Sequence, residues 1–159
     1  SALIVAELIG DYVKAGVDMA CLWPMRYPGS ASIRTLLDVK TNEPKPAYTV
    51  MQLYSSNMGP GSKLVRTAAS NKSVYTCASL ASDGKRLAVF LINKAPTKEG
   101  TEVQVAIEGF QRKSAHAVTL SAPDLKGSQA ALREVEVAGG AGMLTLTLPP
   151  NSMTVVTCD

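Results

Sequence analysis

The sequence has few of the residues from which most catalytic and metal sites are built. Its 159 residues include one histidine, one tryptophan and three cysteines. The lone histidine, His116, lacks cysteines or aspartates at zinc-ligand spacing, and no Cys-x-x-Cys pair occurs, so the common metal and redox motifs are excluded. The Gly-x-Ser-x-Gly elbow of serine hydrolases is also absent. We therefore expect no metal and no cofactor.

Charge and long apolar runs are limited as well. The 16 Lys and Arg against 13 Asp and Glu give a net charge of +3, scattered along the chain rather than gathered into a basic stripe. This pattern argues against nucleic acid as a partner. The most apolar stretches, 2–9 and 87–92, are shorter than the roughly 20 residues that cross a bilayer, so no membrane segment is expected. With 46% hydrophobic residues, the chain should fold around a core.

The first 58 residues have a helical period and a loop. Over 2–14, apolar residues recur every four positions opposite a polar stripe, which predicts an amphipathic helix. The apolar positions are Ile4, Leu8 and Tyr12, and the polar ones are Glu7, Asp11 and Lys14. The apolar segment 17–23 runs into Pro24 and predicts a short strand covered on both faces. After a loop rich in proline, glycine and serine, a second helix is expected to open at Pro46 and to stop near 58.

After Gly61 the period changes to two, which predicts a mainly β fold. Eight segments are expected to be strands: 63–68, 74–81, 87–93, 101–108, 115–121, 132–137, 143–148 and 153–158. Short strands joined by turns, one of them the hairpin signal at 82–84, predict an antiparallel two-layer β-sandwich. Its expected core includes Val89, Leu91, Val105, Ile107, Leu146 and Val155.

Several short segments carry a resemblance to a known family. They are Cys21-Leu22-Trp23-Pro24, Leu36-Leu37-Asp38, Glu43-Pro44-Lys45-Pro46-Ala47-Tyr48, Leu91-Ile92-Asn93-Lys94 and Leu148-Pro149-Pro150-Asn151-Ser152-Met153. In this order and spacing, the chain resembles the C-terminal end of a clan-A glycoside hydrolase of the arabinofuranosidase, xylosidase and agarase type, in which a (β/α)8 barrel is followed by a β-sandwich. The resemblance implies that 1–58 is an α/β remnant, the last strand and helices of the barrel, and that 59–159 is the C-terminal sandwich domain.

The resemblance also implies where the chemistry lies. In that clan the acid/base and the nucleophile are two glutamates at the ends of barrel strands four and seven, which would lie upstream of Ser1. No catalytic residue is then expected in this chain, and its acids, Glu7 and Asp11 among them, are interpreted as solvated charges. The chain would be the C-terminal part of a polysaccharide-degrading enzyme, inactive alone, with the sandwich as a structural or accessory domain. The alternative is a freestanding sandwich module that binds carbohydrate or protein, which the scarcity of aromatic residues after Gly61 disfavours.

Trp23 is the main candidate for substrate contact. The resemblance places it at the C-terminal end of a barrel strand, where its ring could stack on the apolar face of a sugar. Arg26 and Tyr27, in the loop just beyond, are weaker candidates of the same kind. The competing interpretations are a core position for Trp23 and plain exposure for the other two. The expected partner is the polysaccharide or oligosaccharide substrate of the parent enzyme, for which an extracellular or periplasmic location is expected.

Two further expectations concern association and thiols. Residues 1–23 carry apolar side chains that a barrel would cover, so they should either fold back on their own sandwich or pair two chains, and self-association is favoured. Cys77 and Cys158 fall in predicted strands and could form a disulfide, whereas Cys21 should be a buried thiol. Free thiols are favoured for all three, so cysteine usage leaves the cellular compartment open.

Overall fold

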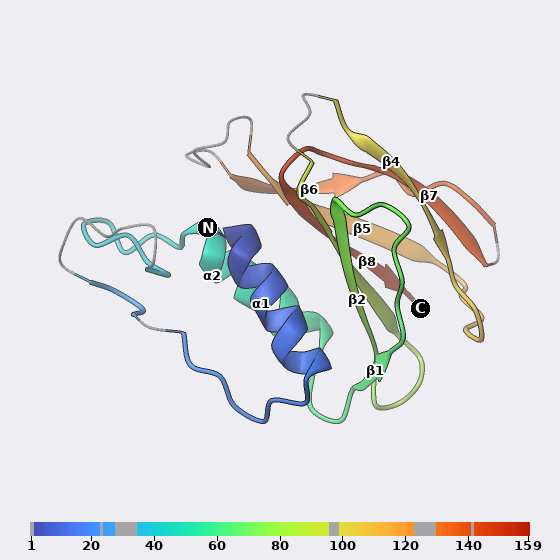
Figure 1. Ribbon diagram of the computed structural model, residues 1–159, viewed down its shortest axis with the longest axis horizontal. Coiled ribbons are helices and arrows are strands. Elements are labelled where there is room, and N and C mark those ends of the chain that lie inside the picture. Colours follow the sequence, from blue (N-terminus) through green and yellow to red (C-terminus); the bar gives the residue numbers. More distant parts are fainter. Residues whose placement is uncertain (1, 23, 28–34, 96–98, 123–129, 141) are drawn as a thin grey trace.

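The computed structural model describes residues 2–22, 24–27, 35–95, 99–122, 130–140 and 142–159. Within them the chain forms two helices and eight strands (Figure 1). In chain order they are α1 (Ala2–Lys14), α2 (Pro46–Asn57), β1 (Lys63–Val65), β2 (Val74–Leu80), β3 (Leu87–Asn93), β4 (Thr101–Ala106), β5 (Ala115–Ser121), β6 (Ala131–Val135), β7 (Met143–Leu148) and β8 (Ser152–Cys158). Both predicted helices and all eight strands predicted after Gly61 are confirmed, most of them to within one or two residues at each end.

The elements stack in three layers. The middle layer is a six-stranded antiparallel sheet with the order β1-β2-β3-β8-β5-β6. A two-stranded sheet of β4 and β7 covers one face, and α1 and α2 lie against the other (Figure 1). The mainly β, antiparallel two-sheet fold class is therefore confirmed, with the helices as a third layer.

The middle sheet separates two hydrophobic cores, and β3 contributes to both because alternate side chains of a strand point to opposite faces. Phe90 and Ile92 pack in the core beneath the helices, whereas Val89 and Leu91 pack against the two-stranded sheet. Val155, expected between the two sheets, instead lies in the core beneath the helices. The sequence pattern marks it as buried but does not specify which face of the sheet it occupies.

The register predicted for β4 is confirmed. Val103, Val105 and Ile107 face the core and are partly buried, while the intervening positions 102, 104, 106 and 108 are exposed. Opposite them, Leu146 of β7 is buried in the same core. The two-stranded sheet therefore has one apolar face and one solvent-exposed polar face, as the alternation of apolar and polar residues in the sequence predicts.

Helix α1 contacts the sheet with the face that carries its small residues. Its buried residues are Ala6 and Gly10. A Cβ atom at Gly10 would lie 2.5 Å from the hydroxyl oxygen of Tyr75, so the missing side chain lets the helix approach β2 closely. The apolar stripe of the sequence pattern points outward instead, where Ile4 and Leu8 are 63% and 42% exposed.

Two acids of α1 hold the helix to the sheet. The Glu7 carboxylate pairs with Lys94 Nζ at 2.7 Å, and the Asp11 carboxylate accepts a hydrogen bond from the Tyr75 hydroxyl at 2.9 Å. Asp11 is exposed and Glu7 is partly exposed, so both acids remain in contact with solvent while they also bind partners on the sandwich. Because Ala6 and Gly10 are small, α1 lies close to the sheet, and Glu7 and Asp11 reach Lys94 and Tyr75.

The strand predicted over 17–23 does not form in the described residues of that segment. Residues 17–22 form no strand, and Met19 is 81% exposed. A strand of a parallel sheet needs hydrogen-bonded neighbours, and the six-stranded sheet lies on the other side of α1 (Figure 1). Cys21 is consequently exposed, so the prediction that it is buried is wrong.

Cys77 and Cys158 are free and buried. They belong to different cores, Cys77 beneath the helices and Cys158 against the two-stranded sheet, and the middle sheet separates them. The Cys77–Cys158 disulfide therefore does not form, and the preference for free thiols is confirmed. No helix in the described ranges is long and apolar enough to span a membrane.

Candidate functional site

The loop that carries Arg26 and Tyr27 is fastened to the segment just before α2. The backbone oxygen of Met25 accepts hydrogen bonds from the N–H groups of both Leu36 and Leu37, each at 3.0 Å. The Arg26 guanidinium donates to the Val39 oxygen at 2.8 Å. Main-chain contacts thus fix the position of this loop, and they bring residues 25 and 26 beside residues 36–39.

Residues 36–45 form a compact turn that supports this loop. Leu37 and Pro44 form an isolated β-bridge, and Asp38 N–H donates to the Glu43 oxygen at 2.9 Å. Asn42 adopts a φ of 60°, a left-handed conformation that asparagine tolerates better than most residues. These contacts fix the shape of the turn next to the loop.

The acids of the turn have structural roles. Asp38 Oδ1 accepts hydrogen bonds from the N–H groups of Lys40 and Thr41, at 2.8 and 3.1 Å. These bonds stabilise the ionised form and lower the pKa of Asp38. Glu43 accepts a hydrogen bond from the Thr41 hydroxyl at 3.1 Å. Both carboxylates therefore hold the turn in shape.

Helix α2 anchors the turn to the sandwich. Its buried residues are Ala47, Val50, Leu53 and Tyr54, and the last three pack against the middle sheet. The Tyr54 ring stacks on Phe90 with 4.4 Å between ring centroids. At the start of the helix, Lys45 Nζ lies 2.8 Å from the Thr35 hydroxyl. The loop at 24–27 is therefore connected to a rigid layer through a short chain of contacts.

The three predicted site residues have different outcomes. Trp23 lies outside the described residues. Arg26 and Tyr27 are both exposed on the loop described above. Arg26 contributes to the local structure through its bond to Val39, and Tyr27 presents about half of its surface to solvent. In the described ranges, no group of three or more His, Cys, Asp or Glu residues is placed to hold a metal ion.

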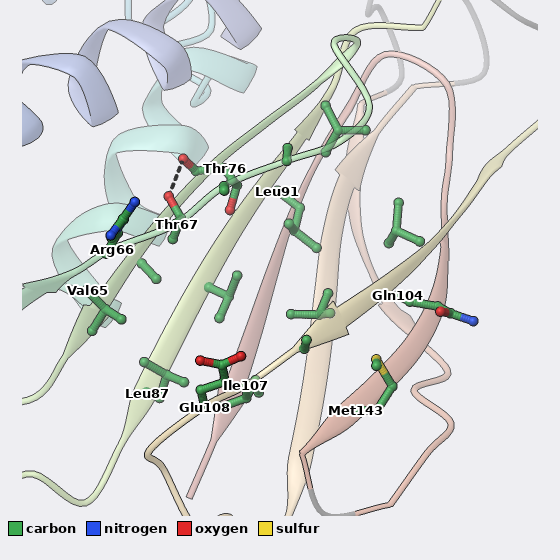
Figure 2. Close-up of a pocket in the computed structure, with 18 of the residues that line it drawn as sticks. Val65, Arg66, Thr67, Thr76, Leu87, Leu91, Gln104, Ile107, Glu108 and Met143 are labelled. Carbon is green, nitrogen blue, oxygen red and sulfur yellow. Dashed lines mark hydrogen bonds between the residues drawn. The ribbon is translucent and has the colours of Figure 1, made fainter.

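A concave site lies between the two sheets and was not predicted. It is a groove of about 870 Å³, bounded on one side by residues 102–110 and on the other by residues 65–71, with β2 and β3 as its floor (Figure 2). Thr67 helps to hold the second wall, because its hydroxyl donates to the Thr76 oxygen at 3.1 Å. The alternation of β4 indicates an apolar face, but whether another strand covers that face depends on the tertiary arrangement.

Comparison with solved structures shows the same fold in glycoside hydrolases. A family 30 subfamily 8 xylanase from Clostridium acetobutylicum matches with a TM-score of 0.79 and 19% identity, over 99% of this chain and 38% of the xylanase. A family 51 arabinofuranosidase from Xanthomonas axonopodis pv. citri matches with a TM-score of 0.78 and 18% identity, over 99% of this chain and 35% of that enzyme.

A third match has the same character. The α-L-arabinofuranosidase of Thermotoga maritima, solved with arabinose, gives a TM-score of 0.75 and 18% identity, over 98% of this chain and 37% of that protein. The sequence matches no protein-family model and no curated protein. The chain thus spans well under half of each solved structure. The expected resemblance to arabinofuranosidases is confirmed in the fold, and it includes the helices as well as the sandwich.

Proposed function

We propose that this chain is the C-terminal part of a polysaccharide-degrading glycoside hydrolase. Residues 1–58 would complete the catalytic barrel, and residues 59–159 would form a structural or accessory sandwich beside it. The observation that carries the proposal is the extent of the likeness, which covers 99% of the chain in a xylanase and an arabinofuranosidase. A likeness restricted to the sandwich would suit an isolated module equally well.

The outer face of the N-terminal segment supports this proposal. Large apolar side chains are exposed on the side of α1 that faces away from the sandwich and along the segment after it. They are Ile4, Leu8, Tyr12, Val17, Met19, Leu22 and Met25. Burial is worth about 25 cal/mol per Å² of apolar surface, and soluble monomers rarely expose large contiguous apolar patches. A barrel packed against this face would cover these residues.

The alternative, a freestanding carbohydrate-binding sandwich, has less support. Such a module needs exposed rings on which sugars can stack. The sandwich region has three aromatic residues, Tyr75, Phe90 and Phe110. Phe90 is fully buried, Tyr75 packs against α1, and Phe110 is half-buried. The sandwich therefore offers no row of exposed rings in its described part.

In this proposal the chain supplies substrate contacts rather than the reacting groups. Trp23, Arg26 and Tyr27 would contact the polysaccharide or oligosaccharide. The general acid and the nucleophile, which in retaining glycosidases lie about 5 Å apart, would come from barrel strands outside this chain. The parent enzyme would act outside the cell or in the periplasm, where its polymeric substrate is found.

Activity measurements test the proposal directly. The 159-residue chain should hydrolyse neither aryl xylosides nor aryl arabinofuranosides, whereas a chain extended upstream along its own reading frame should hydrolyse one of them. In the extended enzyme, Tyr27→Ala should lower kcat/KM at least tenfold, and the matched Tyr48→Ala, on the exposed side of α2, should leave it nearly unchanged. Turnover by the 159-residue chain that disappears when one of its acids is replaced would overturn the proposal.

A further inference from the structure

The turn before β2 contains an acceptor triplet for N-linked sugars. Asn71-Lys72-Ser73 has the pattern Asn-x-Ser/Thr with a middle residue other than proline, which is the acceptor pattern for N-linked oligosaccharides. The sequence has five asparagines in all. The four that lack serine or threonine two positions later are Asn42, Asn57, Asn93 and Asn151. Asn71 is therefore the one asparagine in the chain that meets the sequence requirement of this modification.

The fold places Asn71 where a bulky group has room. Asn71 and Lys72 are exposed, and Ser73 is half-buried. Val74 N–H donates to the backbone oxygen of Asn71 at 3.0 Å, which closes a turn. Lys94 N–H donates to the Ser73 oxygen at 2.8 Å and fastens this turn to the end of β3. An oligosaccharide on Asn71 would therefore project into solvent from a fixed base.

The side-chain amide of Asn71 has its nitrogen free. Its Oδ1 accepts a hydrogen bond from Ser73 N–H at 2.9 Å. In the part of the chain that the structure describes, its Nδ2, the atom to which a sugar attaches, has no hydrogen-bond partner. Asn93 shows the opposite arrangement, because it is fully buried and its Nδ2 donates to three oxygens. A sugar on Asn71 Nδ2 would therefore leave the hydrogen bonds of the turn intact.

We propose that Asn71 is a site of N-linked glycosylation. The donor is an oligosaccharide joined through a diphosphate to a polyprenyl lipid. Asn71 Nδ2 forms a bond to the anomeric carbon of the first sugar, and the bond between that carbon and the diphosphate oxygen breaks. The lipid diphosphate leaves with the electron pair of the broken bond, and Nδ2 loses one of its two protons. The transfer therefore requires no oxidant or reductant.

The position of Asn71 is compatible with the proposed barrel. Asn71 lines the groove between the two sheets, whereas the barrel would cover the outward side of α1. N-linked oligosaccharides are bulky, solubilising surface groups. A glycan on Asn71 would therefore add polar surface beside the groove and leave the outward side of α1 free.

This inference rests on the proposed function in one respect, the location of the parent enzyme outside the cell. A chain meets the lipid-linked donor only where it enters a secretory compartment. The test therefore directs the full 159-residue chain through the secretory pathway of yeast with a cleavable leader. Sugar transfer is then measured whether or not the extended enzyme hydrolyses a glycoside, so failure of the proposed function and failure of this inference are distinguishable.

We expect the secreted chain to migrate as a heavier species in gel electrophoresis. Peptide N-glycosidase should return it to the size of the same chain made in the cytosol. Enzymatic removal converts the modified asparagine to aspartate, which mass spectrometry of the tryptic peptide 67–72 should detect. Asn71→Gln should abolish the heavier species. Asn57→Gln, which replaces an asparagine outside the triplet, is the matched control and should leave it unchanged.

Ser73 provides a second readout, because the triplet requires a hydroxyl at its third position. Ser73→Ala should abolish the modification, and Ser73→Thr should keep it. Thermal unfolding of each variant checks that the fold is retained. The inference is overturned if the secreted wild-type chain carries no glycan, if the glycan persists in Asn71→Gln, or if Ser73→Ala is modified as fully as the wild type.

Discussion

The hydroxyl of Tyr54 donates a hydrogen bond of 2.9 Å to the backbone oxygen of Ala6, and both residues are buried. The same ring stacks on Phe90 of β3. One side chain therefore joins α2 to α1 and to the centre of the middle sheet. The helical layer depends on this contact because α1 presents small residues, rather than its largest apolar side chains, to the sheet.

Replacing Tyr54 with phenylalanine should reduce stability moderately. Tyr54→Phe keeps the stacked ring and removes the hydroxyl, so the loss should equal one buried hydrogen bond, about 1 kcal/mol of unfolding free energy. Urea titration followed by circular dichroism measures it. Tyr48→Phe, on the exposed side of α2, should change stability by less than about 0.5 kcal/mol, and an equal loss in both variants would contradict the assigned contact.

Alkaline pH should destabilise the protein. Burial raises the pKa of Tyr54, and burial together with the Asp11 carboxylate raises the pKa of Tyr75. The unfolded tyrosines lose their protons first, near pH 10, so these two groups stabilise the fold fully below that pH and progressively less above it. Urea midpoints between pH 8 and 11 should fall, and the fall should be shallower in Tyr54→Phe/Tyr75→Phe. If the urea midpoint of that variant falls with pH as steeply as that of the wild type, ionisation of these two tyrosines is not the cause of the alkaline destabilisation.

The three cysteines should react at different rates. Cys21 is exposed, whereas Cys77 and Cys158 are buried and burial raises the pKa of both thiols. Since the thiolate is the reactive form, Ellman's reagent should label one thiol quickly in the native chain and three in denaturant. Cys21→Ser should abolish the fast phase. A melting temperature that falls on addition of dithiothreitol would reveal a disulfide and contradict the structure.

Asn93 should be among the most sensitive polar positions. Its fully buried amide donates to the oxygens of Leu148 and Pro149, at 3.2 and 2.9 Å, and accepts from Ala95 N–H at 3.0 Å. Asn93→Ala removes these hydrogen bonds from a buried site and takes away the acceptor of the Ala95 N–H, so we expect a loss of about 3 kcal/mol. Asn57→Ala, which removes one local bond to Leu53, should cost about 1 kcal/mol or less. Thermal unfolding of the pair measures the difference.

The outward stripe of α1 should drive self-association of the 159-residue chain. The structure folds α1 onto its own sandwich, yet Ile4 and Leu8 stay exposed. Sedimentation velocity at micromolar concentration should detect a dimer, and Leu8→Glu should abolish it. Leu132→Glu, at an equally exposed position on β6, is the matched control and should leave association unchanged. A wild-type chain that sediments as a compact monomer would refute this expectation.

The local pattern of apolar, polar and turn residues predicted most of the fold. Strands such as β3, β5 and β7 were predicted with their observed bounds, because alternation and turn residues are encoded in neighbouring positions. The turn at 81–86 also follows from local chemistry: Gly84 has a φ of 72°, and Asp83 accepts a hydrogen bond from Lys85 N–H.

What the pattern did not predict depends on distant residues. The face with which α1 packs on the sheet was not predicted, because it depends on Gly10 leaving space for Tyr75, which lies 65 positions later in the sequence. The strand at 17–23 was wrong for 17–22 because its apolar side chains meet no partner strand. The groove was not predicted because it lies where the two-stranded sheet covers only part of the six-stranded sheet. The number of strands in each sheet follows from how the strands pair, which the local pattern does not show. For the candidate sugar contacts, the structure gives the position of the loop that carries Arg26 and Tyr27. Binding of sugar by these two residues is part of the proposed function.

The place of β8 in the middle sheet determines when that sheet can be completed. This last strand lies between β3 and β5, so during synthesis the chain holds two unconnected halves, β1-β2-β3 and β5-β6, until residues 152–158 have left the ribosome. Until then the facing edges of β3 and β5 are open to pairing with other chains. A nonsense mutation or a protease cut that removes β8 should therefore cause aggregation rather than a small loss of stability.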